Sequence, residues 1–174
     1  MLPCVLFLSG LMGATIWAPT EEAVIRRADE VALITVKAVD TRVHRGTLLV
    51  QDVQGEISWR PGSSSLQPKQ MITIEVLGGE LQGRVSLVAG SFRAQVGDQA
   101  LVYLSKHGTA YRPWGLSYGW LPLTEGADGR LWLRRSLSGL DIVGEGQPVE
   151  EPWQKRSLKA QLNVITKLRE GRPQ

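Results

Sequence analysis

The stretch MITIEVL at residues 71–77, followed directly by Gly78-Gly79, decides the fold class of this chain. Its residues alternate so that every second side chain is apolar, which is typical of a β-strand with one face in a core. The two glycines end the strand, because glycine tolerates the positive φ of a tight turn. A half-buried strand is therefore predicted near the middle of the sequence.

Segments on both sides of this strand carry similar patterns. Five of them are predicted to be strands: 31–39, 46–60 with a candidate break at Gly55, 101–104, 111–123 and 130–135. The first is apolar and β-branched at nearly every position, which predicts burial on both faces at its centre. Asp128-Gly129 predicts a hairpin between the last two segments.

Helices are predicted at the two ends of this run of strands. Thr20, followed by two glutamates, is a suitable N-cap for a short helix over 20–29. Near the C-terminus, Ser157 is a suitable cap for a second helix. The apolar positions of that helix form one stripe: Leu158, Leu162, Ile165 and Leu168. A single stripe predicts that the helix lies on another surface of the protein.

The order of helix, strands and helix shows no strand–helix alternation, which argues against a parallel sheet. We therefore predict a mainly β protein: a small antiparallel barrel of the oligosaccharide/oligonucleotide-binding (OB) type, flanked by a short N-terminal helix and an amphipathic C-terminal helix. The alternative is a β-sandwich. The predicted domains are a signal segment at 1–18, the barrel with its leading helix at 19–138, and an acidic Gly/Pro connection with the C-terminal helix at 139–174.

The N-terminal segment predicts export of the protein. Residues 1–19 carry no charge, and residues 2–12 are mostly apolar, as in a secretory signal. The run is shorter than the roughly 20 apolar residues that span a bilayer, so no transmembrane span is expected after signal removal. The alternative is a buried N-terminal strand or helix. We expect a secreted or periplasmic protein whose mature chain has lost its single cysteine, Cys4.

Most catalytic chemistry lacks the residues that it needs. One cysteine and two histidines, His44 and His107, argue against a disulfide framework and a metal site, and no cofactor motif is present. The stretch GLSYG at 115–119 matches the G-x-S-x-G motif of hydrolases, but no histidine follows Ser117 and a proline-containing, strand-like stretch replaces the required helix. We interpret this match as accidental and predict a protein that is not an enzyme.

The aromatic residues offer a candidate binding surface. Trp114, Tyr118 and Trp120 share one parity along the predicted strand 111–123, so they would point to one face, close to Arg112. Such a face can stack on a sugar, a peptide or bases; the alternative is that it forms the barrel core. The candidate binding residues are Arg112, Trp114 and Tyr118, together with the loop residues Gly78, Gly79 and Glu80.

Charge gives a second kind of candidate surface. The formal net charge is only +3, which disfavours nucleic acid as a partner. The excess of positive charge gathers near the C-terminus, where Lys159 and Lys167 are candidates for docking on an anionic surface. The alternative is an ordinary solvated helix face.

Several short motifs together resemble a broad group of uncharacterised exported bacterial proteins with a netrin/metalloprotease-inhibitor-like barrel. The motifs are Arg27-Ala28-Asp29-Glu30-Val31, Gly78-Gly79-Glu80 with Gly83, Gly90-Ser91-Phe92, the nine residues from Val96 to Leu104, and Tyr111-Arg112. The resemblance implies an exported OB-type barrel without catalytic residues, and it suggests a secreted protease as partner. The characterised inhibitors of this kind depend on a cysteine-anchored N-terminus and disulfides, which the mature chain lacks, so their mechanism is not implied here.

These observations lead to one main hypothesis and two alternatives. The main hypothesis is an exported, non-enzymatic binding protein whose partner is a protein, such as a secreted protease or an envelope component. One alternative is a hydrolase that uses an unrecognised carboxylate pair, for which Asp40, Asp52 and Glu56 lie in neighbouring predicted strands. The other is a structural or assembly protein of the cell envelope. The sequence leaves the oligomeric state open.

Overall fold

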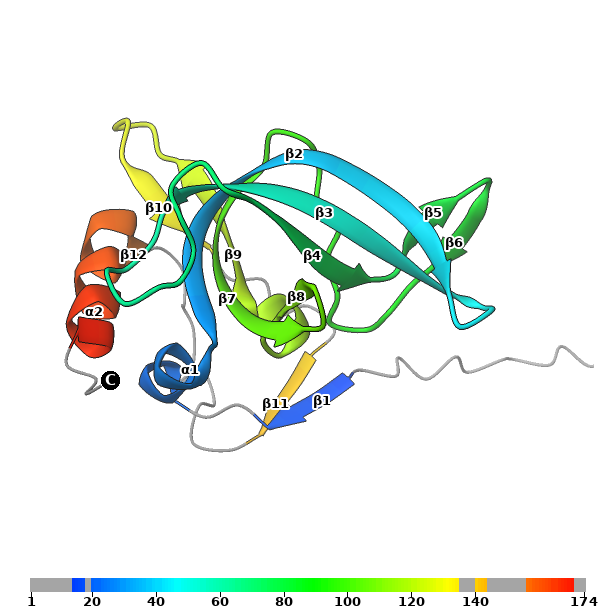
Figure 1. The fold of residues 1–174 in the computed structure, drawn as a ribbon, viewed down its shortest axis with the longest axis horizontal. Coiled ribbons are helices and arrows are strands. Elements are labelled where there is room, and N and C mark those ends of the chain that lie inside the picture. Colours follow the sequence, from blue (N-terminus) through cyan, green and yellow to red (C-terminus); the bar gives the residue numbers. More distant parts are fainter. Residues whose placement is uncertain (1–13, 18–19, 135–139, 144–155, 171–174) are drawn as a thin grey trace, which may run out of the picture.

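Five strands close into a barrel in the computed structural model, which describes residues 14–17, 20–134, 140–143 and 156–170 (Figure 1). The barrel strands are β2 (Glu30–His44), β3 (Leu48–Trp59), β4 (Met71–Leu77), β7 (Gln99–His107) and β8 (Ala110–Pro113). Around the barrel their order is β2-β3-β4-β8-β7, and β7 pairs with β2 to complete the ring. Strand β7 returns to lie beside β2 after the β2-β3-β4 meander, which is a Greek-key connection.

The predicted fold class is confirmed, and the sandwich alternative is wrong. The prediction that the barrel is wholly antiparallel needs one correction, because β4 and β8 pair in parallel. The reason is geometric: directions cannot alternate all the way around a closed ring with an odd number of strands. The parallel pair is also the shortest contact of the ring, with Ile74 opposite Tyr111 as its one paired position.

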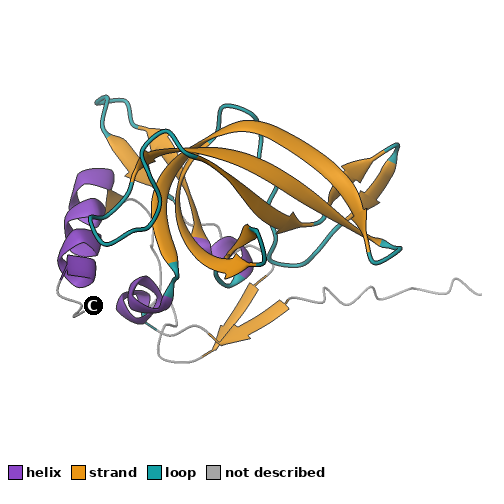
Figure 2. Ribbon diagram, viewed as in Figure 1, coloured by secondary structure: helices purple, strands orange, loops and turns teal. Residues whose placement is uncertain are grey.

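Strands β2 and β7, which lie next to each other in the barrel wall (Figure 2), each contribute residues to two hydrophobic cores. The first core fills the barrel interior and includes Ile34, Ile74 and Val102. The second lies outside the barrel wall, between β2, β7 and the helices, and includes Val31 and Tyr103. Both faces of β2 are therefore buried at its start rather than at the centre of the predicted strand 31–39, where Thr35 is half-buried and Lys37 is exposed.

The two helices lie side by side against this second core (Figure 1). Helix α1 (Glu21–Arg27) begins after Thr20, whose side-chain oxygen accepts a hydrogen bond from the Ala23 N–H at 3.3 Å. Helix α2 (Leu158–Glu170) begins after Ser157, and the predicted apolar stripe packs on the second core. Both predicted helices and their caps are confirmed.

A buried polar network ties α2 to the barrel. The side-chain amide of Gln161 donates to the Tyr103 hydroxyl at 3.0 Å and to Glu21 at 3.3 Å, while Arg169 donates to the Ala28 carbonyl at 2.7 Å. The helix is thus held by directional bonds as well as by apolar contact.

The long strand predicted over 111–123 is wrong. Strand β8 ends at Pro113, which lacks the N–H that would continue the ladder, and the 3-10 helix η1 (Leu116–Gly119) follows. Strand β9 (Trp120–Glu125) then pairs with Ala100–Val102 of β7, beside the part of β7 that pairs with β8. Two short strands therefore share one edge of β7 where the pattern suggested a single strand.

The candidate break at Gly55 is also wrong. Strand β3 runs through Gly55, which is buried, and a Cβ there would lie 3.0 Å from the Ile34 side chain. The register shifts of this pair fall instead along the opposite strand, between Val36 and Ala38 and between Leu33 and Ile34 of β2. Glycine at this position makes room for a core side chain.

Short strands complete the described part of the chain. They are β10 (Leu131–Leu133) and β12 (Arg156–Ser157), which extend the sheet from β9; β5 (Gly79–Leu81) and β6 (Arg84–Ser86), which form a separate hairpin; and β1 (Ala14–Trp17) and β11 (Leu140–Val143), which pair in parallel. The hairpin predicted at Asp128-Gly129 is confirmed between β9 and β10. Of the predicted signal segment, residues 14–17 form β1 and the remainder lies outside the described residues, as does most of the predicted connection after 139.

Candidate functional site

The β5–β6 hairpin projects from the end of the barrel at which β2 turns into β3 (Figure 1). Gly78 places it there: its N–H donates to the Leu49 carbonyl at 2.8 Å, and a Cβ on Gly78 would lie 2.9 Å from the Ser86 carbonyl oxygen. We call residues 43–47 and 78–93 the hairpin end. The predicted loop Gly78-Gly79-Glu80 belongs to it.

A half-open pocket of about 110 Å³ lies at the hairpin end. Apolar side chains contribute much of its lining: Leu77, Leu87, Val88 and Phe92. Phe92 also stacks on Trp120 in the barrel core, with ring centroids 4.4 Å apart, which holds this wall in place. The pocket therefore has a firm apolar side and an opening to solvent.

Apolar side chains stand exposed at the hairpin end, and one of them, Leu87, lines the pocket. Leu87 is 83% exposed, and Val85 and Val43 are each about half exposed at 49% and 47%. Exposed apolar groups that gather next to a pocket mark a surface that a partner covers, whereas scattered ones carry no such meaning. The hairpin end is the described surface where both features occur together.

A cluster of charged residues lies on the outer face of the barrel, around Glu75 on β4. Arg42 binds Asp52 at 2.5 and 3.1 Å and Glu75 at 2.5 Å, while Arg112 binds the other oxygen of Glu75 at 2.8 Å. His107 lies 3.9 Å from the same oxygen. We call these five residues the Glu75 cluster.

The Glu75 cluster reinforces the closure of the barrel. Strands β4 and β8 share one paired position, so the Glu75–Arg112 ion pair adds a side-chain link across the shortest contact of the ring. The two arginines are matched by two carboxylates, which leaves no unbalanced charge for a ligand. Predicted binding residue Arg112 is thus engaged within the barrel wall.

The ion pairs of the cluster shift the pKa values of its members. Burial by itself would raise the pKa of Glu75, but hydrogen bonds and charges from Arg112 and Arg42 outweigh it and hold that pKa below its ordinary 4.5. The hydrogen bond to Asp52 raises the pKa of Arg42. Elsewhere, burial and then the charges of Glu30 and Asp29 raise the pKa of Tyr111.

We predict that Glu75→Gln makes stability less dependent on pH. Because the folded-state pKa of Glu75 is lowered, its contribution is present above the ordinary pKa and is lost as pH falls through the folded value. The substitution should cost about 1–2 kcal/mol at neutral pH, after allowing for the partial exposure of both arginines. Urea unfolding of the wild type and of Glu75→Gln, from neutral pH into acid, measures the difference between their unfolding free energies. This difference should shrink towards zero as the pH falls.

The matched control is Glu22→Gln, which removes a carboxylate from the exposed Glu22–Arg26 pair of α1. It should cost about 0.5 kcal/mol or less. A Glu75→Gln deficit that stays constant across the pH range would contradict the role given to the cluster.

The aromatic face predicted from the sequence does not form. Trp114 and Tyr118 pack in the second core, edge to face with ring centroids 5.8 Å apart, and Tyr118 is fully buried. Trp120 lies in the first core. The prediction that the three share one face is wrong, because η1 interrupts the strand and Trp120 lies on the opposite side of the barrel wall from Trp114 and Tyr118.

The G-x-S-x-G stretch has a different geometry from that of a hydrolase. Ser117 is buried in η1, and a strand follows it rather than a helix. Gly119 approaches the backbone of Trp114 and Tyr103 so closely that a Cβ would lie 2.5–2.8 Å from their atoms. The glycine therefore serves packing, as the interpretation of an accidental match requires.

The carboxylates considered for catalysis lie on the outer face and are partly paired with cations. Asp40 and Asp52 face each other across β2 and β3, Asp52 binds Arg42, and Glu56 lies 3.3 Å from Lys37. Within the described residues, no group of three or more histidine, cysteine, aspartate or glutamate side chains is placed to hold a metal ion.

The predicted docking residues Lys159 and Lys167 both lie exposed on α2. Whether they contact an anionic surface stays a prediction. Among the helices of the described chain, none has the length and apolar character needed to cross a bilayer.

Only one part of the hairpin end, Gly78-Gly79-Glu80, is predictable from the sequence. The sequence points to neither Leu87 nor the pocket, and its apolar patterns do not predict β5 and β6 as strands. Gln82-Gly83 is a typical two-residue hairpin turn, and it is the feature of the sequence that indicates two short strands on either side of it. The exposure of Leu87 leaves no mark in the sequence, because an apolar residue in a strand-like run is read as core.

Comparison with known proteins gives no further assignment: no protein-family model, curated protein or solved structure matches the chain. The resemblance to exported inhibitor-like barrels therefore stays a prediction. The structure supports its coarser part, a small mixed five-strand barrel.

Proposed function

We propose that this chain is an exported, non-enzymatic protein that binds a partner protein through the hairpin end. The observation that carries the proposal is the exposed side chain of Leu87 beside a half-open apolar pocket. Burial of such a side chain contributes about 1.5–3 kcal/mol to association, as expected of an interface anchor. The partner class is a secreted protease or an envelope component.

The geometry supports binding more than the alternatives. The Glu75 cluster and the hairpin end differ as binding surfaces. The charges of the Glu75 cluster neutralise one another, whereas the hairpin end leaves apolar side chains exposed to solvent. Of the carboxylates considered for a hydrolytic pair, Asp52 binds Arg42 and Glu56 lies 3.3 Å from Lys37, so both are engaged with cations on the outer face.

The test is affinity capture from the native organism with the wild-type protein and with Leu87→Asp. We expect Leu87→Asp to recover the main co-purifying protein at least about tenfold less well, since a carboxylate would replace the anchor. The control is Leu131→Asp, which changes another exposed leucine, 40% exposed on β10. Equal recovery with wild-type protein and Leu87→Asp would refute the proposal.

The envelope-docking alternative predicts a different result in the same experiment. Replacing Lys159 and Lys167 with glutamate reverses two charges on the exposed face of α2. We expect this double variant to capture the partner as well as the wild type does. A selective loss with this variant, and none with Leu87→Asp, would favour docking through α2.

A further inference from the structure

The hairpin end carries more positive than negative charge. Its two segments contain three arginines, Arg45, Arg84 and Arg93, against one carboxylate, Glu80. Among the described residues, Arg93 lies 3.7 Å from Glu80 in a well-exposed pair, and neither Arg45 nor Arg84 forms an ion pair. Such a surface favours carboxylates.

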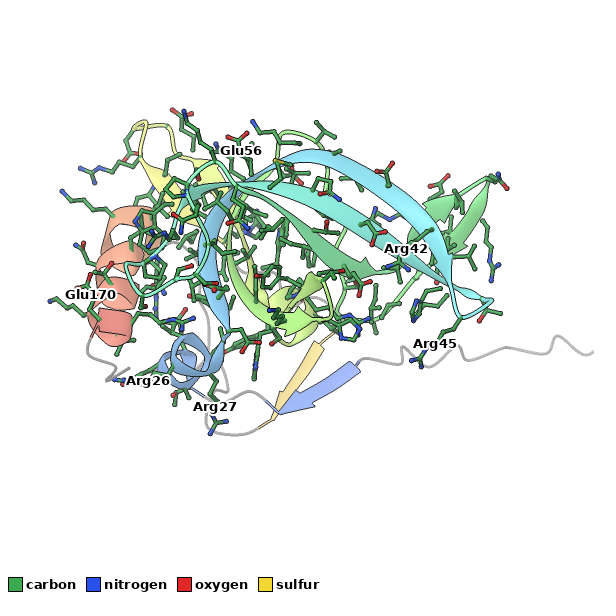
Figure 3. All side chains as sticks on the ribbon, viewed as in Figure 1. Arg26, Arg27, Arg42, Arg45, Glu56 and Glu170 are labelled. Atoms are coloured by element: carbon green, nitrogen blue, oxygen red, sulfur yellow. The ribbon has the colours of Figure 1, made fainter. Side chains whose placement is uncertain are left out.

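The arginines are held near one another at the tip of the barrel. Arg45 lies at the β2–β3 turn (Figure 3). From β6, the Arg84 guanidinium donates to the Thr47 carbonyl of that turn at 2.5 Å, which fixes the hairpin against it. Arg93 lines the pocket itself. Arg93 thus borders the apolar site itself, whereas Arg84 and Arg45 lie on β6 and at the adjoining β2–β3 turn.

Strand β6 offers a free edge next to the pocket. The β5–β6 turn consists of Gln82 and Gly83, both with positive φ, as in a two-residue hairpin turn. In such a hairpin the flanking pair, Leu81 and Arg84, is hydrogen-bonded. The next pair, Glu80 and Val85, is not, so its backbone N–H and C=O groups point away from the partner strand. The N–H and C=O of Val85 thus face an edge that no described strand covers, a geometry that accepts an extended peptide.

The size of the pocket limits the side chain that it takes. Its volume of about 110 Å³ is below the roughly 150 Å³ of a cavity that admits benzene. An aliphatic side chain fills this space, whereas an aromatic ring would extend through the opening into solvent.

We infer that the hairpin end binds an extended, acidic segment of the partner, which adds to the edge of β6, places one aliphatic side chain in the pocket and sets its carboxylates against Arg45, Arg84 and Arg93. This inference rests on the proposed function and names the chemistry that the partner presents. Main-chain pairing supplies the register, the pocket selects the side chain, and the arginines select the charge.

The test uses acetylated nonapeptides as probes in an NMR titration of the full chain. The first alternates glutamate and threonine around a central leucine; the second replaces each glutamate with lysine; the third replaces the leucine with tryptophan. We expect the first to bind at least about tenfold more tightly than the other two, with shifts at Val85, Leu87 and Val88. Arg84→Glu should reverse the preference between the acidic and basic peptides.

Each outcome is decisive. Equal binding of acidic and basic peptides, or shifts confined to other surfaces, would overturn the inference. No peptide binding, while Leu87→Asp still loses the captured partner, would overturn the ligand class and leave the proposed function standing. A chain that forms a dimer dependent on Leu87 and ignores all peptides would show that a second copy is the occupant, which also overturns the inference.

Discussion

Gly119→Ala lowers the free energy of unfolding by about 3 kcal/mol or more, the largest effect that we expect from a single added methyl group in this protein. A Cβ at this position would lie 2.5 and 2.6 Å from the Trp114 carbonyl oxygen and nitrogen, and 2.8 Å from the Tyr103 carbonyl oxygen. All three are backbone atoms, so no side-chain rotation relieves the contact. The junction of β8, η1 and β9 with β7 must move instead.

Thermal or urea unfolding measures this effect. For a chain of this length, a loss of 3 kcal/mol lowers Tm by roughly 6–12 °C. Gly62→Ala is the matched control, because the nearest atom to its added Cβ is a Glu170 side-chain oxygen at 3.8 Å, an ordinary contact. It should change stability by no more than about 0.5 kcal/mol. Similar stability of the two variants would mean that Gly119 is not packed as described.

Gly78→Ala is expected to displace the β5–β6 hairpin and to weaken partner binding as well as stability. Gly78 has φ +95°, and a Cβ there would lie 2.9 Å from the Ser86 carbonyl oxygen. Backbone strain costs about 1–2 kcal/mol, and the close contact with β6 raises the total to about 2–3 kcal/mol. Because Gly78 and Ser86 both line the pocket, its shape changes too.

The control for Gly78→Ala is Gly83→Ala in the turn of the same hairpin. Gly83 has φ +76°, but a Cβ there meets no atom within 4 Å, so this variant carries the strain without the contact. Unfolding free energies and amide hydrogen exchange in β5 and β6 compare the two. If Gly83→Ala costs as much as Gly78→Ala and exposes the hairpin amides equally, the close contact at Gly78 has no consequence.

Local patterns predicted the elements of the fold better than their pairing. The stretch 71–77 forms β4 with the predicted bounds, and Thr20 and Ser157 cap the helices that they were expected to cap. Each of these features depends on residues close together in the sequence. The ring closure depends on β8 meeting β4, a contact that one backbone pair and the ion pair of Glu75 with Arg112 define.

The candidate site shows the same limit. Alternation over 111–123 predicts a single strand, but Pro113 and the 3-10 turn after it break the ladder and send Trp114 and Trp120 into different cores. Val96 is a second case: it begins the motif that runs into β7, yet its side chain is 67% exposed. Which apolar residue remains outside is set by the three-dimensional closure of the barrel, which short-range spacing does not encode.

The central claim is that the hairpin end contacts a protein partner, and site-specific photo-crosslinking tests it most directly. A photoreactive amino acid is placed at position 87 of the full chain in the native organism, and in a second variant at position 131. The account predicts a discrete cross-linked product with one partner protein from position 87 and none with that partner from position 131. A product from position 131 alone, or no product from position 87 while the protein still co-purifies with its partner, would contradict it.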